Sequence, residues 1–205
     1  MHLRLQKTFR TLAVAALAAA SMAAFAQPAA PQGLRGTLSA VSADSITVHT
    51  NRGADQVVKL DKDSRVNAIT LANINDIKPG SYIGTAAIPQ PDGSQKALEV
   101  HVFPPAMAGT GDGHRPFDLA PNSTMTNGTV GDLVATSGRT LTLKYKGGEK
   151  KILVPEDVPV VNIEPGDRSL LAVGTKVVVR TRKEGDGSLT ATGISAGRNG
   201  VTPPM

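Results

Sequence analysis

The amino-acid sequence predicts an exported, all-β protein built from two similar halves. Three observations support this prediction. The chain starts with a leader of the secretory type, its later segments alternate apolar and polar residues, and one pattern of strands and turns occurs twice at a spacing of about 94 residues. Alternation with a period of two residues is typical of a strand with one buried face.

The first 26 residues have the features of a secretory signal peptide. Arg4, Lys7 and Arg10 precede an apolar run at residues 11–23, and residues 24–26 form a small-x-small cleavage site. The run is about a dozen residues long, which is shorter than the ~20 residues that span a bilayer. We therefore expect cleavage rather than a retained anchor, and a periplasmic mature chain without a transmembrane segment. The chain has no cysteine, so neither a lipid-attachment signal nor a disulfide is expected.

Charge and aromatic content argue against nucleic acid as a partner. The leader contains three of the basic residues and no acid, so its removal lowers the net charge from +5 to +2. Only Tyr82, Phe103, Phe117 and Tyr145 remain as aromatic residues. Proteins that bind single strands use aromatic stacking platforms in a positive groove. Neither feature is evident in this sequence.

The internal repeat keeps its order and its hydrophobic phase. The matching segments are residues 35–38 with 127–130, 79–83 with 173–177, and 92–94 with 186–188. This pattern favours a duplication, although a β meander that reuses its turn residues would produce a weaker form of it.

Each copy has the order of an OB-fold barrel, with three strands, a short helical piece and two more strands. The first copy has expected strands at residues 34–41, 46–50, 57–60, 82–88 and 95–103, and a helical piece near 71–77. The second has expected strands at residues 127–134, 140–145, 151–154, 176–180 and 189–195, and a helical turn near 169–171. We therefore expect an all-β fold of two tandem five-stranded OB-like barrels, at residues 34–103 and 127–197. A continuous β-sandwich is the alternative architecture.

Residues 104–126 form the predicted linker between these barrels. They are rich in Pro, Gly, Asp, Asn and Ser and show no sustained periodicity. An irregular segment of this length inside a compact protein is usually functional or disordered. Two interpretations stay open: a strap that joins the barrels, or a recognition loop. The residues expected to contact a ligand in the second case are Asp112, His114, Arg115, Phe117 and Asp118.

Three segments of the mature chain resemble a family of exported bacterial proteins. They are Arg35-Gly36-Thr37, the turn at residues 77–83, and the linker at residues 109–119 with 123–127. The family is known only as a domain of unknown function, with small β-barrel repeats behind a signal peptide. The resemblance implies a β-barrel repeat protein of the cell envelope and implies no catalytic residues.

A metal site is the sharpest chemical hypothesis. Glu99 and His101 are two residues apart on an expected strand, so both point to the same, outward face, and His114 in the linker could fold back over them. Mixed His and carboxylate ligands suit Zn²⁺ or another first-row ion. However, the spacing matches no established ligand pattern, and an outward Glu and His on a strand are usually solvated.

The remaining chemistry is sparse. The sequence has no Gly-x-Ser-x-Gly elbow and no His-Glu-x-x-His pair, so it predicts no catalytic residue. Lys144, Lys146, Lys150 and Lys151 surround a Gly-Gly turn and are typical of a solvated hairpin tip. We therefore expect a non-enzymatic, periplasmic binding or scaffolding protein that uses no cofactor and binds an envelope protein or a small ligand. A periplasmic metal-binding protein is the alternative, and a hydrolase-like enzyme is a weaker one.

Overall fold

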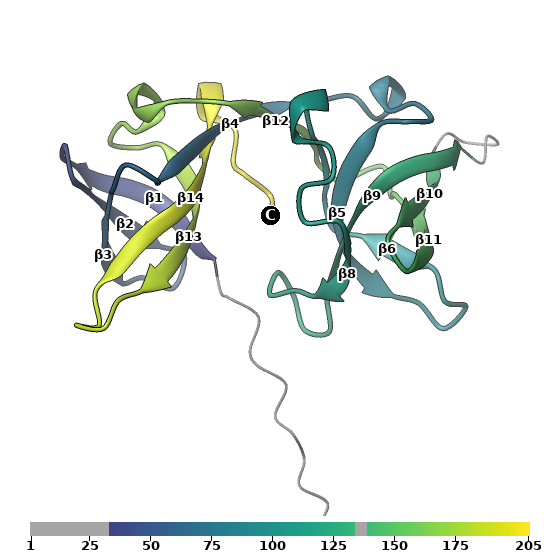
Figure 1. Ribbon diagram of the computed structural model, residues 1–205, viewed down its shortest axis with the longest axis horizontal. Helices are drawn as coiled ribbons and strands as arrows, with labels where there is room; N and C mark the ends of the chain where they lie inside the picture. The colour runs from purple at the N-terminus through teal and green to yellow at the C-terminus, as the bar shows by residue number, and fades with distance from the viewer. Residues whose placement is uncertain (1–32, 134–138) are drawn as a thin grey trace, which may run out of the picture.

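The computed structural model describes residues 33–133 and 139–205 (Figure 1). The predicted signal peptide at residues 1–26, and Val134 at the end of an expected strand, lie outside the described residues. The described part is all-β, and its helices are short 3-10 turns. The strands are β1 (Leu34–Val41), β2 (Ser45–Thr50), β3 (Asp55–Lys59), β4 (Arg65–Leu71), β5 (Tyr82–Pro89), β6 (Gln95–Ala97), β7 (Val100–Val102), β8 (Gly113–Pro116), β9 (Thr124–Leu133), β10 (Thr140–Tyr145), β11 (Gly148–Leu153), β12 (Val160–Pro165), β13 (Lys176–Lys183) and β14 (Leu189–Gly197). The 3-10 turns are η1 (Ile74–Asp76), η2 (Pro105–Met107), η3 (Arg168–Leu170) and η4 (Arg198–Gly200).

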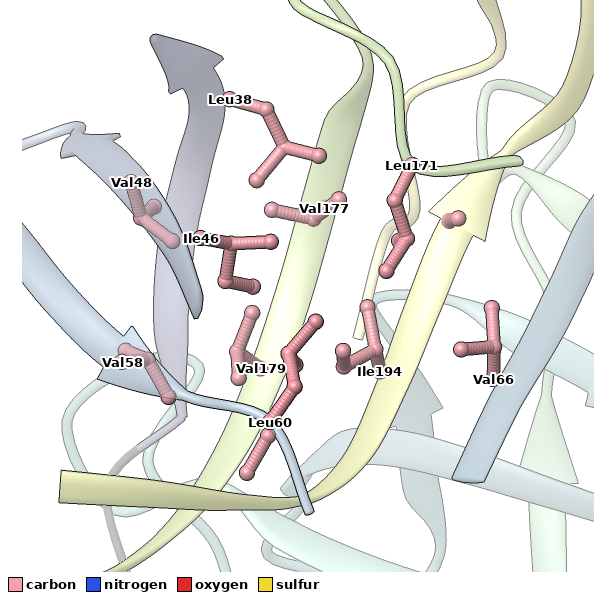
Figure 2. Close-up of a cluster of buried hydrophobic side chains, with 12 residues drawn as sticks. Leu38, Ile46, Val48, Val58, Leu60, Val66, Leu171, Val177, Val179 and Ile194 are labelled. Carbon is pink, nitrogen blue, oxygen red and sulfur yellow. The ribbon is translucent and has the colours of Figure 1, made fainter. Parts of the chain in front are cut away.

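Five strands close a barrel. The pairings run from β1 to β2, β3, β14 and β13, and β13 returns to β1. Ile46 and Val48 of β2 point inward and are buried, as the alternation predicts. Figure 2 shows their side chains meeting Leu38, Val179 and Ile194 from three other strands in one apolar core. Closing the ring pairs every strand on both sides, which removes exposed sheet edges.

A second ring of pairings lies in the other half of the molecule (Figure 1). It runs from β9 to β10, β11, β6 and β5, and β5 pairs back onto β9. The side chains that it buries form a separate apolar cluster. Its buried members are Ile77, Ile83, Ala97, Val100, Val130, Leu141, Leu143, Ile152, Val154 and Val160.

The grouping of strands differs from the predicted tandem arrangement. Residues 34–103 do not close on themselves. Their first three strands, β1–β3, join β13 and β14 from the end of the chain, whereas β5 and β6 join β9–β11. The prediction that each repeat forms its own barrel was therefore wrong in its partners. The physical reason is β4, which leaves the first barrel along the edge of β14 and so carries the chain away from β1–β3.

The two rings nevertheless use the same registers. Gly36 faces Val177 in the first ring, and the matching residues Gly128 and Ile83 face each other in the second. Outside the rings, Val66 faces Ile194 and Val160 faces Val100. The pairing partners are thus exchanged between the repeats while the geometry of each pairing is kept.

Strands β4 and β12 join the two halves and were not predicted. They pair antiparallel over residues 67–71 and 161–165, and Ile69 faces its repeat counterpart Ile163 at the centre. On its other edge β12 pairs with β7, so β4 and β12 form a bridge inside one continuous sheet of 14 strands among the described residues. A third apolar cluster packs at this bridge. It consists of Ile69, Tyr82, Phe103, Val161, Ile163 and Met205.

The expected helical pieces are single 3-10 turns. The Asn73 side chain accepts a hydrogen bond from the Asn75 N–H at the start of η1, and the Asp167 side chain accepts one from the Ser169 N–H at the start of η3. A short polar side chain at this position satisfies a backbone N–H that the turn itself cannot. The two repeats therefore match in the side chains that cap these 3-10 turns as well as in their strands.

Cutting the chain distinguishes this exchanged arrangement from tandem barrels. We expect fragments 33–121 and 122–205 each to fail to fold as a monomer, because each ring takes strands from both fragments. Mixed together, they should regain the strand circular dichroism and the cooperative unfolding of the intact chain. A fragment that unfolds cooperatively as a monomer, as checked by analytical ultracentrifugation, would contradict the exchange.

Candidate binding site beside the linker

The linker is more regular than predicted. It contains η2 and β8, and its last residues begin β9. The prediction that residues 104–126 are irregular throughout was therefore wrong in part. β8 pairs with β9 and lies on the side of the second ring that faces the first barrel (Figure 1). The linker therefore packs between the two halves of the molecule.

Asp118 attaches the linker to the first barrel. Its carboxylate accepts two hydrogen bonds from the Arg35 guanidinium, at 2.8 and 2.9 Å, and one from the Gly33 N–H at 3.1 Å. The Arg35 guanidinium also lies over the Phe117 ring, 5.8 Å from its centroid. Burial raises the pKa of Asp118, but the hydrogen bonds and the charge of Arg35 outweigh it and hold this pKa below 3.8. Two of the predicted ligand contacts, Phe117 and Asp118, thus serve as a strap.

The tail of the chain lies against the same arginine. Arg35 Nε donates to the main-chain oxygen of Met205 at 3.0 Å, and Met205 is buried. At the matching position of the second ring, Asn127 Nδ2 donates to the main-chain oxygen of Thr110, also at 3.0 Å. Arg35 on β1 and Asn127 on β9, at matching positions of the repeat, therefore each hold a distant segment of the chain through its main chain.

His114 and Asp112 attach the linker to the β10–β11 hairpin. His114 Nδ1 lies 2.8 Å from Thr126 Oγ1, and its ring stacks on Tyr145 with centroids 6.1 Å apart. Asp112 Oδ1 accepts a hydrogen bond from the Lys146 N–H at 2.7 Å. Burial lowers the pKa of His114, and the charges of Lys150 and Arg115 lower it further. Both side chains thus have partners inside the protein.

Arg115 is the predicted ligand contact that the strap does not use. It follows His114 on β8 and pairs with Met125, so its side chain lies on the opposite face of the strand from His114. Arg115 Nη1 donates to the main-chain oxygen of Gly111 at 2.8 Å. Burial lowers the pKa of Arg115, and the charge of Arg180 on β13 lowers it further. Arg115 is thus exposed, with a main-chain oxygen of the linker as its hydrogen-bond partner.

Glu99 and His101 share one face, as predicted, but the expectation that they are solvated was wrong. Glu99 is 0% exposed and His101 3% exposed, and His101 Nδ1 lies 2.9 Å from Glu99 Oε2. Glu99 Oε1 also accepts a hydrogen bond from the Ala86 N–H at 2.7 Å. The expected strand 95–103 is interrupted at Leu98 and Glu99, which lie between β6 and β7. This interruption lets the carboxylate reach the backbone of β5.

Gly84 creates the room for this buried pair. A β-carbon at Gly84 would collide with His101 Nε2 and Asn127 Oδ1, so both side chains cover the glycine from the same face of the sheet. Asn127 Oδ1 is buried and has no hydrogen-bond partner within the described part of the chain. The Phe103 ring contacts His101 edge-on, with centroids 4.9 Å apart, and helps to exclude water.

The proposed metal ligands do not converge. His101 and Asn127 cover one face of the sheet over Gly84, whereas His114 contacts Thr126, whose side chain lies on the other face of β9. Residues 33–133 and 139–205 contain no group of three or more His, Cys, Asp or Glu side chains arranged to hold a metal ion. Glu99, His101 and His114 therefore do not form one ligand set.

Two open grooves lie near these elements. The first, of about 540 Å³, lies between the start of the linker and the bridge, and its lining includes Arg65, Val66, Asn67, Met107, Thr110 and Asp167. The second, of about 610 Å³, lies on the first barrel beside β3 and includes Val57, Lys59, Arg182 and Glu184. The first is bounded by the predicted linker, so we call it the linker groove.

Sequence reasoning missed Arg35, Gly84, Asn127 and Arg180. A signal for two of them was present, because Arg35 and Asn127 occupy matching positions in the repeat. A difference between a charged and a neutral polar residue at one repeat position marks a site where the copies have diverged.

Comparison of the chain with protein-family models, with curated proteins and with solved structures gives no match. The resemblance of the linker to an exported family therefore stays a prediction. In the described part of the chain, we find no helix with the length and apolar character needed to cross a membrane.

Replacing one member of the buried Glu99–His101 pair should destabilise the fold. His101→Ala leaves the Glu99 carboxylate buried without its side-chain partner, and we expect the free energy of unfolding to fall by about 3 kcal/mol. Urea unfolding followed by circular dichroism measures this change. As a matched control, the double variant Glu99→Leu/His101→Leu should recover part of the loss, because it removes both polar groups. A loss below about 1 kcal/mol in His101→Ala would show that the pair is not a structural element.

The strap should be sensitive to acid. The folded-state pKa of Asp118 lies below its ordinary value of 3.8, so the carboxylate stabilises the fold above that pH, and this stabilisation is lost as the pH falls through the folded-state pKa. We expect Asp118→Asn to lower the thermal midpoint at neutral pH, and the two midpoints to converge below pH 3.8. Asp63→Asn, at an exposed surface pair with Lys62, is the control and should change little at any pH. An Asp118→Asn deficit that persists unchanged in acid would refute the role of the charge.

Proposed function

We propose that this chain is a non-enzymatic binding protein of the cell envelope, exported by its leader, which binds an envelope component in the linker groove. The observation that supports the proposal most directly is the placement of the linker, which is fixed between two joined barrels and bounds an open groove. A volume of about 540 Å³ is within the range of ligand sites in proteins, roughly 300–1,000 Å³.

The fold is consistent with this function. We infer that each ring is an OB-like barrel and that the two arose by duplication. In each ring, the third strand of one repeat pairs parallel with the last strand of the other, β3 with β14 and β11 with β6. This single parallel pair agrees with an OB-like order in both halves. OB barrels bind ligands on one face near their loops. The linker and the bridge lie against these barrels and add walls to the space beside them.

The lining of the groove indicates a ligand with both apolar and polar parts. Val66 and Met107 supply apolar surface, while Asn67 and Thr110 supply hydrogen-bonding groups. Arg65 and Asp167 place opposite charges along the same groove, and both are exposed. A mixed lining of this kind orients a ligand through a few polar contacts while apolar surface is buried.

Photo-crosslinking tests the site without knowledge of the ligand. A photoreactive residue at Asn67 should yield a discrete mass increase on the protein purified after irradiation of living cells. The same probe at Val57, in the second groove, is the matched control and should yield none. Filling the linker groove with Thr110→Trp should abolish the Asn67 adduct, because Thr110 is exposed on its wall. The same adduct at both probe positions, or none at Asn67, would contradict the proposal.

A further inference from the structure

The first barrel has an open cavity at the end where β1 starts and β2 turns into β3. The cavity has a volume of about 370 Å³, and its lining includes Leu34, Thr50, Asn51, Ala54, Gln56 and Leu119. Thr50 follows Val48 by two residues on β2, so its side chain has the inward direction of that core residue. Leu34 packs against the same apolar core, which Figure 2 shows. The cavity therefore lies at the end of the barrel core, and we call it the barrel mouth.

In the second ring, a linker side chain occupies the corresponding position. His114 on β8 faces Thr126 on β9, and its Nδ1 lies 2.8 Å from Thr126 Oγ1. The His114 ring stacks on Tyr145 at the end of β10, with centroids 6.1 Å apart. Lys150 on β11 is close enough for its charge to lower the pKa of His114. Residues of three strands thus surround one side chain that β8 supplies.

The residues around His114 have counterparts that line the barrel mouth. The pairs, with the second ring first, are Thr126 and Leu34, Tyr145 and Thr50, and Lys150 and Gln56. The first pair precedes the aligned residues Asn127 and Arg35, the second ends β10 and β2, and the third faces Leu143 and Val48. Within residues 33–133 and 139–205, β1 pairs with β2 and β13 alone, so no described strand covers this mouth as β8 covers its counterpart.

The main chain of β1 beside the mouth already has hydrogen-bond partners. The Gly33 N–H donates to the Asp118 carboxylate at 3.1 Å. The main-chain oxygen of Arg35 accepts a hydrogen bond from the Asn51 N–H at 2.9 Å. A ligand therefore gains little from adding a strand at this edge, and its recognition depends on the group that enters the cavity.

The lining favours an apolar group with polar neighbours. Leu34 places apolar surface where Thr126 places a hydroxyl in the second ring, and Ala54 adds to this surface. Asn51 and Gln56 carry amide groups on the same lining. Amide groups can exchange hydrogen bonds with a peptide main chain while an apolar side chain enters between them. These features together match one side chain of a peptide.

We propose that the barrel mouth binds an extended peptide segment of another protein through one apolar side chain, in the position that His114 has in the second ring. A volume of about 370 Å³ is within the range of ligand sites, roughly 300–1,000 Å³, and barrel mouths are frequent places for them. Removing the apolar side chain from water supplies the binding free energy. The barrel mouth shares no lining residue with the linker groove, so this inference goes beyond the proposed function.

Two fluorescent peptides test the site. Both have the sequence of residues 111–118, and in one of them His114→Leu introduces the apolar side chain. Fluorescence anisotropy with the purified protein should show saturable binding of the His114→Leu peptide. The unchanged peptide should bind about tenfold more weakly, because its imidazole would be buried without the hydroxyl that Thr126 offers in the second ring.

Substitutions of the protein locate the binding. Ala54→Trp, at an exposed position of the lining, should abolish binding by filling the cavity. Val57→Trp is the matched control, because Val57 is exposed on the outer face of β3. Thr110→Trp fills the linker groove and should also keep peptide binding. Leu34→Thr should bring the affinities of the two peptides together, since it restores a hydroxyl at this position.

Three results would overturn the inference: no saturable binding of the His114→Leu peptide, equal affinity of the wild-type protein for both peptides, or undiminished binding to Ala54→Trp. A wild-type dimer that Ala54→Trp converts to a monomer in analytical ultracentrifugation would also overturn it, because the mouth would then hold a second copy of the chain. The Asn67 adduct should be unchanged in Ala54→Trp, so failure of the barrel mouth is distinguishable from failure of the linker groove.

Discussion

The antiparallel pairing of β4 with β12 is the constraint on which the rest of the structure depends. Each of these strands uses one edge for the other and its second edge for a strand attached to a barrel, β14 for β4 and β7 for β12. A buried backbone N–H or C=O needs a partner, so neither half of the molecule can rotate about the bridge without breaking ladder hydrogen bonds. The linker, the tail and the third apolar cluster all pack against a frame that this pairing makes rigid.

The local structure could be predicted from the sequence, whereas the strand partners could not. The alternation at Ile46 and Val48, together with the turn at Asp92-Gly93-Ser94, identified strands that the structure contains. In a tandem barrel Gly36 would face Ile83, and in the exchanged one it faces Val177. Both partners are buried and apolar, because the repeats share one hydrophobic pattern. A duplicated hydrophobic pattern therefore fits the barrel pairings of either arrangement, and β4 and β12, which pair with each other across 90 to 98 residues of sequence, decide between them.

The candidate site could also be predicted only in part, because it depends on contacts between residues that lie far apart in the sequence. The alternation correctly placed Glu99 and His101 on one face, but not that Gly84 and Phe103 would let this face be buried. The sequence analysis posed the choice between a strap and a recognition loop for the whole linker. In the structure, individual linker residues differ in what they contact. Phe117 and Asp118 contact Arg35 of the first barrel, whereas Arg115 is exposed and donates to the main chain of Gly111. The Arg35–Asp118 pair spans 83 residues, a separation at which sequence spacing carries no information about contact.

The exchange of strands also determines when the fold can form during synthesis. Leu34 at the start of β1 faces Val179 on β13, so the first barrel can close only when nearly the whole chain has been synthesised. Folding that depends on contacts of such long sequence separation is slow, because the entropy of closing the loop is lost before the contacts form. The early strands of the first barrel therefore lack their partners until β13 and β14 have been synthesised, whereas the second ring has all of its strands once β11 ends at Leu153.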